Sequence, residues 1–201
     1  MIREMTAHSD NPYRQIFQAL SDEEIRYLVV GGVAVNLHGY QRYTGDIDIL
    51  LALDEKNLEK MTQLMHSMGY VERFPVGLEP IVDVGQLKQR VYEGIPELRF
   101  RSDAVQYLQI GINVLLGPSL RFEEFYSRRE ECFTVMCRMP LSCAGDVLLF
   151  QRNRSVDREY IHRCRATTPA QRLDWLAAAL DFVRMVEKSH PTQARKSSNG
   201  G

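Results

Sequence analysis

The chain has 201 residues, 44% of them hydrophobic and 25% charged, and a formal net charge of -1 at pH 7. This length suits one domain, or a catalytic domain with a helical extension, and excludes two large domains. The near-neutral charge argues against a broadly basic surface that coats nucleic acid, and no apolar run reaches the roughly 18 to 20 residues that cross a bilayer. Because the polar start lacks the apolar core of a signal peptide, we expect a cytoplasmic protein with no membrane partner.

The first half of the chain alternates helical and extended patterns. Apolar spacing predicts helices over about 12–20 and 55–68, and Ser21 is expected to start a short helical turn before the first strand. A buried strand over 26–30, a helix over about 33–38 and a strand over 46–53 are expected between them. Prolines and glycines interrupt residues 70–105, which predicts loops and short strands there.

The second half is expected to begin with two more strands and to end in helices. The strands are expected over 107–116 and 133–139, with a short amphipathic helix over 121–131 between them. Ser142 and Ser155 are candidate caps for helices reaching about 153 and 165, and Thr168 with Pro169 opens a last helix to about 188. We therefore expect a first domain over 1–140, a helical extension over 141–189, and a disordered tail over 190–201.

Two glycines and two aspartates form the motif that carries chemistry. Gly31 and Gly32 end the first buried strand and start a helix, where unpaired backbone N–H groups attract phosphate. Asp46 and Asp48 open the next strand, and alternation puts both carboxylates on one face of it. Two carboxylates in this position can hold one divalent ion or two, so the pattern predicts a nucleotide site beside a metal site.

This motif resembles that of the nucleotidyltransferase superfamily with the DNA polymerase beta-like catalytic fold. It is most similar to the minimal bacterial branch, which includes toxins of abortive-infection and related toxin–antitoxin systems. The residues that match, in order, are Gly31, Gly32, Ala34, His38, Gly39, Arg42, Thr44, Asp46, Ile47 and Asp48. The resemblance implies an α/β (α+β) fold, with a small mixed β-sheet backed by helices and a helical C-terminal part.

The resemblance also implies a third carboxylate from a later strand, and here the sequence departs from the pattern. Asn113 stands where an aspartate is expected. An amide oxygen can ligate magnesium, but it brings no negative charge and cannot accept the proton of an attacking hydroxyl. Asp83 and Asp103 are substitutes by residue type, although each also suits a solvated loop. If the alignment is correct, the Asn113 side chain should lie within roughly 4 to 6 Å of both aspartates.

A second departure concerns the cation that neutralises the triphosphate. Gln151 occupies the place where related sequences carry a lysine. Arg152 or Arg154 can supply that charge, although both also suit a solvated helix face.

The function that this resemblance implies is transfer of an NMP from an NTP to an acceptor hydroxyl, with Mg²⁺ or Mn²⁺ as cofactor. Asp46, Asp48 and Asn113 are the expected catalytic residues, the first two as metal ligands, and Gly31, Gly32, Arg42 and Thr44 are expected to bind the nucleotide. The acceptor is a protein, an RNA or a small molecule, with a macromolecule favoured and an antitoxin as a candidate partner. The alternative is a degenerate member that senses nucleotides or binds a protein without catalysis. Asn113 and Gln151, which stand where an aspartate and a lysine are expected, both favour this alternative.

Overall fold

The computed structural model describes residues 11–73, 84–95, 97–102, 110–133, 138–144, 146 and 167–189. The helices are α1 Pro12–Asp22, α2 Gly31–Leu37, α3 Glu55–Ser67, α4 Val84–Tyr92, α5 Leu116–Ser119, α6 Phe122–Ser127 and α9 Pro169–Ser189. The strands are β1 Tyr27–Val30, β2 Asp46–Leu51, β3 Val71–Arg73, β4 Glu97–Arg101, β5 Gly111–Leu115, β6 Glu130–Phe133 and β7 Arg138–Leu141.

The described strands form one mixed sheet in the order β3-β4-β5-β2-β1-β7-β6. Strands β2 and β5 run parallel, as do β1 and β7, and the other neighbours are antiparallel. The expected fold class is therefore confirmed: helices back a mixed β-sheet in an α+β arrangement. The central strand β2 lies between β5 and β1, so its side chains are flanked on both sides.

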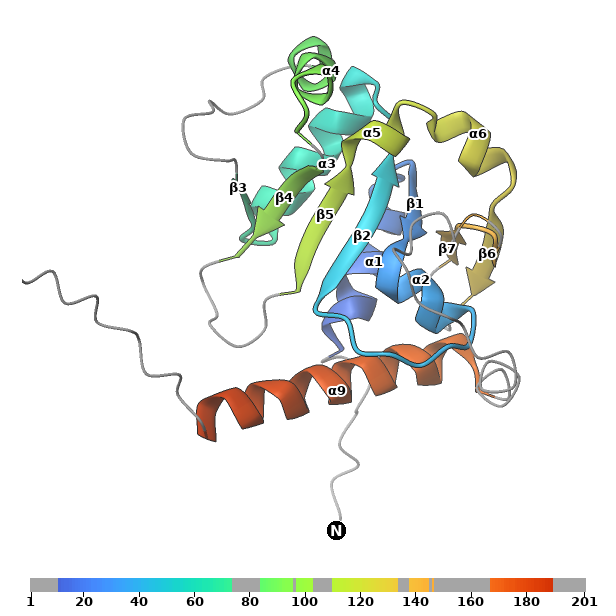
Figure 1. Ribbon diagram of the computed structural model, residues 1–201, viewed down its shortest axis with the longest axis vertical. Helices are drawn as coiled ribbons and strands as arrows, with labels where there is room; N and C mark the ends of the chain where they lie inside the picture. The colour runs from blue at the N-terminus through green and yellow to red at the C-terminus, as the bar shows by residue number, and fades with distance from the viewer. Residues whose placement is uncertain are drawn as a thin grey trace, which may run out of the picture.

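The main hydrophobic core fills one face of this sheet. Helices α1 and α3 lie behind the strands in Figure 1, and their apolar stripes pack against the buried side of β1, β2, β4 and β5. The stripe of α9 joins the same core; its members are Leu173, Leu176 and Leu180. Burial of such stripes is the dominant favourable contribution to folding. Among the described helices, none combines the length and hydropathy of a membrane span.

Polar contacts hold α9 against the helices at the start of the chain. The buried Arg14 of α1 pairs with Asp174 at 2.7 Å. The buried Arg172 donates to the backbone oxygens of Leu37, at the end of α2, and Thr167. A guanidinium at the carboxyl end of a helix satisfies a carbonyl that has no partner within the helix and interacts favourably with the helix dipole.

The opposite face of β2 is divided into an open part and a covered part. Its alternating residues are Asp46 and Asp48, which are half-buried, followed by Leu50 and Ala52, which are buried. Phe122 and Phe125 of α6 pack with Leu50 and Ala52 in a second, smaller apolar cluster. Helix α6 therefore covers the far end of this face and leaves the two aspartates accessible.

Three expectations for the middle of the chain were wrong. Residues 84–92 form helix α4 instead of loop, because Val84 and Leu87 lie three residues apart and bury one face, while Gly94, with φ at +87°, follows where the helix has ended. The helix expected over 121–131 ends at Ser127, and the strand expected over 133–139 is instead two antiparallel strands, β6 and β7, on either side of residues 134–137.

Smaller differences concern element ends and the part of the chain that is not described. Ser21 belongs to α1, and the strand expected over 107–116 is β5, from Gly111 to Leu115. The last helix begins at Pro169 as expected, with Thr168 and Gln171 capping each other's backbone N–H groups. Residues for which roles were considered but which lie outside the described part are Asp83, Asp103, Gln151, Arg152 and Arg154.

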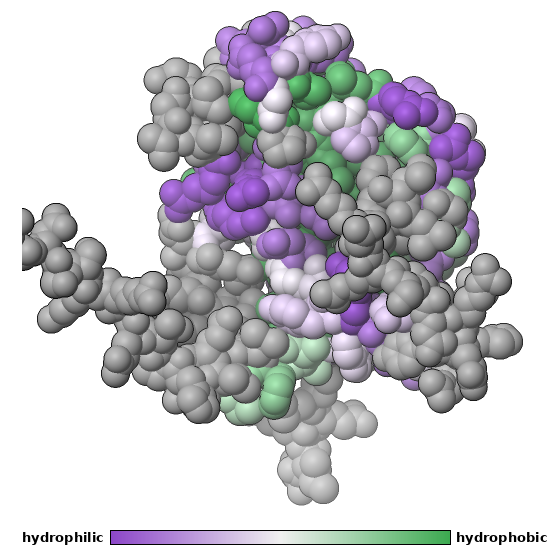
Figure 2. Space-filling view, in the orientation of Figure 1, coloured by the Kyte–Doolittle hydropathy of each residue, from purple (hydrophilic) through white to green (hydrophobic). Residues whose placement is uncertain are grey.

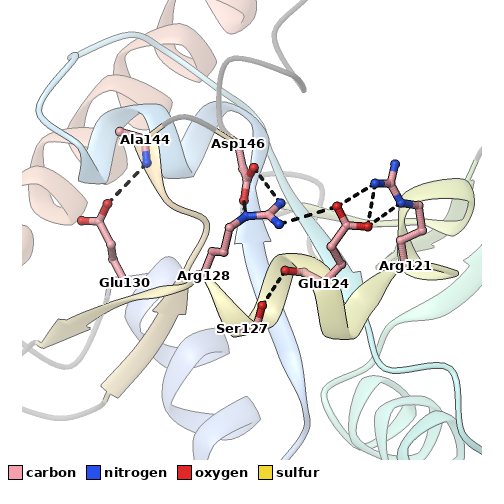
Figure 3. A network of polar contacts seen from close by, with 7 residues as sticks. All are labelled: Arg121, Glu124, Ser127, Arg128, Glu130, Ala144 and Asp146. Carbon is pink, nitrogen blue, oxygen red and sulfur yellow. Dashed lines mark hydrogen bonds and ion pairs between the residues drawn. The ribbon is translucent and has the colours of Figure 1, made fainter.

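A network of ion pairs fastens α6 to the segment after β7 (Figure 3). Arg128 donates to both carboxylate oxygens of the buried Asp146, at 3.1 and 3.3 Å, and lies 3.5 Å from Glu124. Glu124 accepts two hydrogen bonds from Arg121, and the pKa of Arg128 is raised, chiefly by its hydrogen bond to Asp146. These four side chains therefore form a connected network that holds α6 over its end of the sheet.

Candidate functional site

The site forms around Asp46 and Asp48 at the beginning of β2. The two carboxylates lie on the open face of the sheet, whereas Ile47 and Ile49 are fully buried on the other face, as the alternation predicted. Strand β5 runs parallel beside β2 and pairs Asp46 with Gly111 and Asp48 with Asn113.

The glycine turn supports the Asp48 carboxylate. Gly31 begins α2 directly after β1 with φ at +64°, a conformation that favours glycine. A Cβ atom built on Gly31 would lie 2.0 Å from Asp48 Oδ2, so glycine is required here for space as well as for conformation. The backbone N–H of Gly32 donates to the Asp48 carboxylate. The start of α2 therefore binds a carboxylate of the chain itself through one of the donors expected to hold phosphate.

Asn113 completes this arrangement from the neighbouring strand. Its side chain is only 7% exposed, and Nδ2 donates to Asp48 Oδ1 at 2.9 Å. Asn113 therefore lies beside Asp48, as expected, and it is linked to Asp46 through Arg101, which contacts both side chains. The catalytic role of Asn113 remains a prediction.

The surroundings of Asp48 raise its pKa above the ordinary carboxyl value. Desolvation by burial is the largest cause, and the negative charges of Asp46 and Glu97 add to it. The hydrogen bonds from Asn113 and Gly32 act in the opposite direction. A cation nearby would stabilise the charged form of a carboxylate in this position.

The expected nucleotide-binding residues Arg42 and Thr44 lie beside Gly32. A Cβ atom on Gly32 would lie 2.6 Å from Thr44 Oγ1 and 3.1 Å from Arg42 Nη2. The fully buried Asn36 fixes this loop, because its amide donates to the backbone oxygens of Gly32 and Arg42 and accepts from Arg42 N–H. The hydroxyl of Thr44 donates to the Asp46 carbonyl at 3.1 Å. The structure thus brings all seven predicted site residues together, while their roles toward a ligand remain predictions.

Arg101 of β4 is a site residue that the sequence reasoning missed. Its Nη2 lies 3.1 Å from Asn113 Oδ1 and 3.6 Å from Asp46 Oδ1, and its Nη1 donates to the Phe100 carbonyl at 2.9 Å. The signal was present in residues 97–101, where charged residues alternate with the buried Leu98 and Phe100. That alternation predicts a strand with a charged face, but not which strand it pairs with.

The charged face of β4 extends the polar surface around the two aspartates. Figure 2 shows hydrophilic side chains gathered over the β3–β4–β5 part of the sheet. Arg99 pairs with Glu97 on this face, and Arg73 of β3 pairs in register with Arg99. Positive and negative charges are therefore mixed next to the carboxylates, and no uniformly basic surface surrounds them in the described part of the chain.

The donor set fits one hard divalent cation better than two. Asp46 and Asp48 offer carboxylate oxygens, which Mg²⁺ and Mn²⁺ prefer. In the described part of the chain, no group of three histidine, cysteine, aspartate or glutamate side chains could hold a metal ion. Two carboxylates with water and substrate oxygens suffice for Mg²⁺, which keeps several non-protein ligands.

A hollow of about 350 Å³ lies at the other end of β2, beyond α6. Its charged lining includes Arg26, which pairs with Glu123, and Arg121, which pairs with Glu124. Because these cations already bind neighbouring carboxylates, the lining offers an anionic ligand little net attraction. The concentration of chemically useful groups therefore favours the Asp46 end of the strand.

No protein-family model and no curated protein sequence matches the chain. Among solved structures, the chain is similar to the lincosamide antibiotic adenylyltransferase LnuA in its lincomycin-bound crystal structure. The two are 14% identical, the match covers 84% of this chain and 98% of that chain, and the TM-score is 0.46.

Proposed function

We propose that the protein transfers an NMP from an NTP to an acceptor hydroxyl. The observation that carries this proposal is the position of Asp48, whose carboxylate contacts the Gly31–Gly32 turn on one side and Asn113 on the other, with Asp46 on the same open face. A glycine turn at a helix start and paired carboxylates in contact with it are the parts that such a transfer requires.

In this reaction, the acceptor oxygen attacks the α-phosphorus of the NTP. The bond from the α-phosphorus to the bridging oxygen breaks, and pyrophosphate leaves with the bonding electron pair. Asp46 and Asp48 would hold Mg²⁺ or Mn²⁺, which when bound neutralises charge on the phosphates. The proton of the acceptor hydroxyl passes to one of these two carboxylates, because the Asn113 amide cannot take it.

The nucleotide is oriented by the groups at the start of α2. The remaining backbone N–H groups at the start of α2 would donate to phosphate oxygens, and the Arg42 guanidinium beside Gly32 contributes positive charge. The Thr44 hydroxyl, which donates to the Asp46 carbonyl, can instead donate to a phosphate oxygen when the nucleotide binds.

For the acceptor we favour a macromolecule, with the chain acting as the toxin of a toxin–antitoxin pair. The support for this choice is the resemblance of the motif from Gly31 to Asp48 to the minimal bacterial branch of the superfamily. A protein, an RNA and a small hydroxyl compound are the three classes to compare.

The alternative is a protein that binds a nucleotide without transferring it. The specific observation in its favour is the contact between Arg101 and Asn113. A catalytic site would have a third carboxylate at this place, whereas here the Asn113 amide lies beside the Arg101 guanidinium. Under this alternative, the purified protein binds NTP but yields no labelled product.

The test is to incubate the purified protein with each α-labelled NTP and Mg²⁺ or Mn²⁺. Cell extract, total RNA and lincomycin serve as separate acceptor sources. We expect label transfer by wild type, loss of transfer in Asp46→Ala/Asp48→Ala, and retention in Asp22→Ala/Glu59→Ala, which removes two exposed carboxylates from other elements.

Two results would change the conclusion. Transfer by Asn113→Asp but not by wild type would establish the degenerate alternative. Absence of transfer in both, together with absence of NTP binding in calorimetry, would overturn the proposed function.

A further inference from the structure

Arg101 has a site built for it between Asp46 and Asn113. Its guanidinium reaches both side chains through the same nitrogen, Nη2, and its other terminal nitrogen is fixed by the Phe100 carbonyl. The side chain is 27% exposed, whereas that of Asp46 is 46% exposed. The arginine therefore lies against the sheet, underneath the open face of the carboxylates.

Gly111 provides the space for this guanidinium. A Cβ atom at Gly111 would lie 2.2 Å from Arg101 Nη1, 2.4 Å from Arg101 Cζ and 2.3 Å from Asp46 Oδ1. Gly111 does not have a positive φ angle, so its backbone conformation does not require glycine. The absence of a side chain at this buried position of β5 is therefore explained by the guanidinium that lies over it.

Asn113 is oriented to match the arginine. Its Nδ2 donates to Asp48 and its Oδ1 accepts from Arg101, so both ends of the amide are used. An aspartate at this position would place a third negative charge beside Asp48, and an asparagine lets the chain satisfy Asp48 and Arg101 at once. Asn113, Gly111 and Arg101 thus fit one another as a set.

We propose that Arg101 is a resident cation, a positive charge that the chain itself supplies to the site. Beside Asp46 and Asn113 it replaces the charge of a second metal ion, so the site binds one divalent ion instead of two. This inference rests on the proposed function. It also accounts for the missing third carboxylate, because a guanidinium carries its charge at every physiological pH and needs no further ligand.

The experiment counts Mn²⁺ ions bound to the full chain by electron paramagnetic resonance during a MnCl₂ titration. We expect one ion per chain in wild type and two in Arg101→Gln/Asn113→Asp, because that double variant removes the resident cation and restores the third carboxylate. Arg101→Gln alone should still bind one ion, with an affinity higher by roughly twofold to fivefold, as expected from loss of one partly exposed like charge.

A second arginine of β4 tests whether the position of the positive charge matters. Arg99→Ala is the matched control, because Arg99 lies on the same strand, is 55% exposed and pairs with Glu97 instead of the two aspartates. Its Mn²⁺ affinity should equal that of wild type.

The inference fails if wild type binds two ions, if the double variant still binds one, or if Arg99→Ala raises the affinity as much as Arg101→Gln. Failure of the proposed function gives a different result. In that case neither wild type nor Asn113→Asp transfers label or binds NTP, whatever number of Mn²⁺ ions each chain binds. If Asp46→Ala/Asp48→Ala binds Mn²⁺ as wild type does, the metal lies away from these carboxylates and the inference about Arg101 fails as well.

Discussion

Replacing Gly31 by alanine tests whether the glycine turn and Asp48 are in direct contact. Gly31 has φ at +64°, and an alanine in this left-handed conformation costs about 1 to 2 kcal/mol. The new methyl group would also lie 2.0 Å from Asp48 Oδ2 and 2.7 and 2.8 Å from its Cβ and Cγ. Forcing a partly buried side chain to move by such an overlap costs roughly 1 to 3 kcal/mol. We therefore expect Gly31→Ala to lower the free energy of unfolding by about 2 to 5 kcal/mol.

Gly94→Ala is the control for the backbone contribution. Gly94 also has positive φ, at +87°, but no heavy atom lies within 4 Å of a Cβ built on it. Its substitution should therefore cost only the conformational part, about 1 to 2 kcal/mol. The difference between the two variants measures the overlap with Asp48.

The assay is urea unfolding followed by circular dichroism, which gives the free energy of unfolding for each variant. Each kcal/mol corresponds to a change in melting temperature of roughly 2 to 4 °C for a chain of this size. The pair is then repeated in an Asp48→Gly background, where the side chain that overlaps with residue 31 is gone and the two alanines should cost the same. Equal losses for Gly31→Ala and Gly94→Ala in the wild-type background would refute the contact.

Three further predictions concern the site and its support. Without divalent ions, the contribution of Asp48 to stability should fall as pH rises from 3.8 through its raised pKa, because the folded state keeps the Asp48 proton longer than the unfolded state; urea titrations should show this fall as the difference between wild type and Asp48→Asn. Asn113→Asp should lower stability by about 1 to 3 kcal/mol in EDTA, and thermal melts should show recovery with Mg²⁺. Arg172→Met should cost about 1 to 3 kcal/mol in urea unfolding, because the Leu37 carbonyl loses its donor.

The central part of the fold could be predicted because its signals are local. The glycines at 31 and 32 mark the change from strand to helix, and the alternation at 46–49 fixes which residues face the core. The helix over 169–189 has a cap and a regular apolar stripe, so its start was identified from the sequence. In each of these elements, residues only a few positions apart determine the structure.

The elements that were missed depend on contacts between distant segments. Helix α4 has only nine residues, and its stability comes from burying Val84 and Leu87 against the rest of the fold. Strand β6 pairs with β7 and lies at the edge of the sheet, with only Cys132 buried. A pattern this short reads equally well as the end of a helix, because the pairing that decides it lies outside the window.

The candidate site shows the same division between local and distant information. The closeness of Asp48 and Asn113 was expected from the resemblance of the motif, whereas Arg101 reaches Asp46 and Asn113 only because β4 pairs with β5 in a register that the sequence does not disclose. The register matters chemically, since a shift by one residue would turn Arg99 and Arg101 toward the core and bring Leu98 and Phe100 to the open face. Asn113 of β5, which stands in place of the third carboxylate, is therefore matched by Arg101 of β4. These two residues must be changed together to test which ions the site can bind.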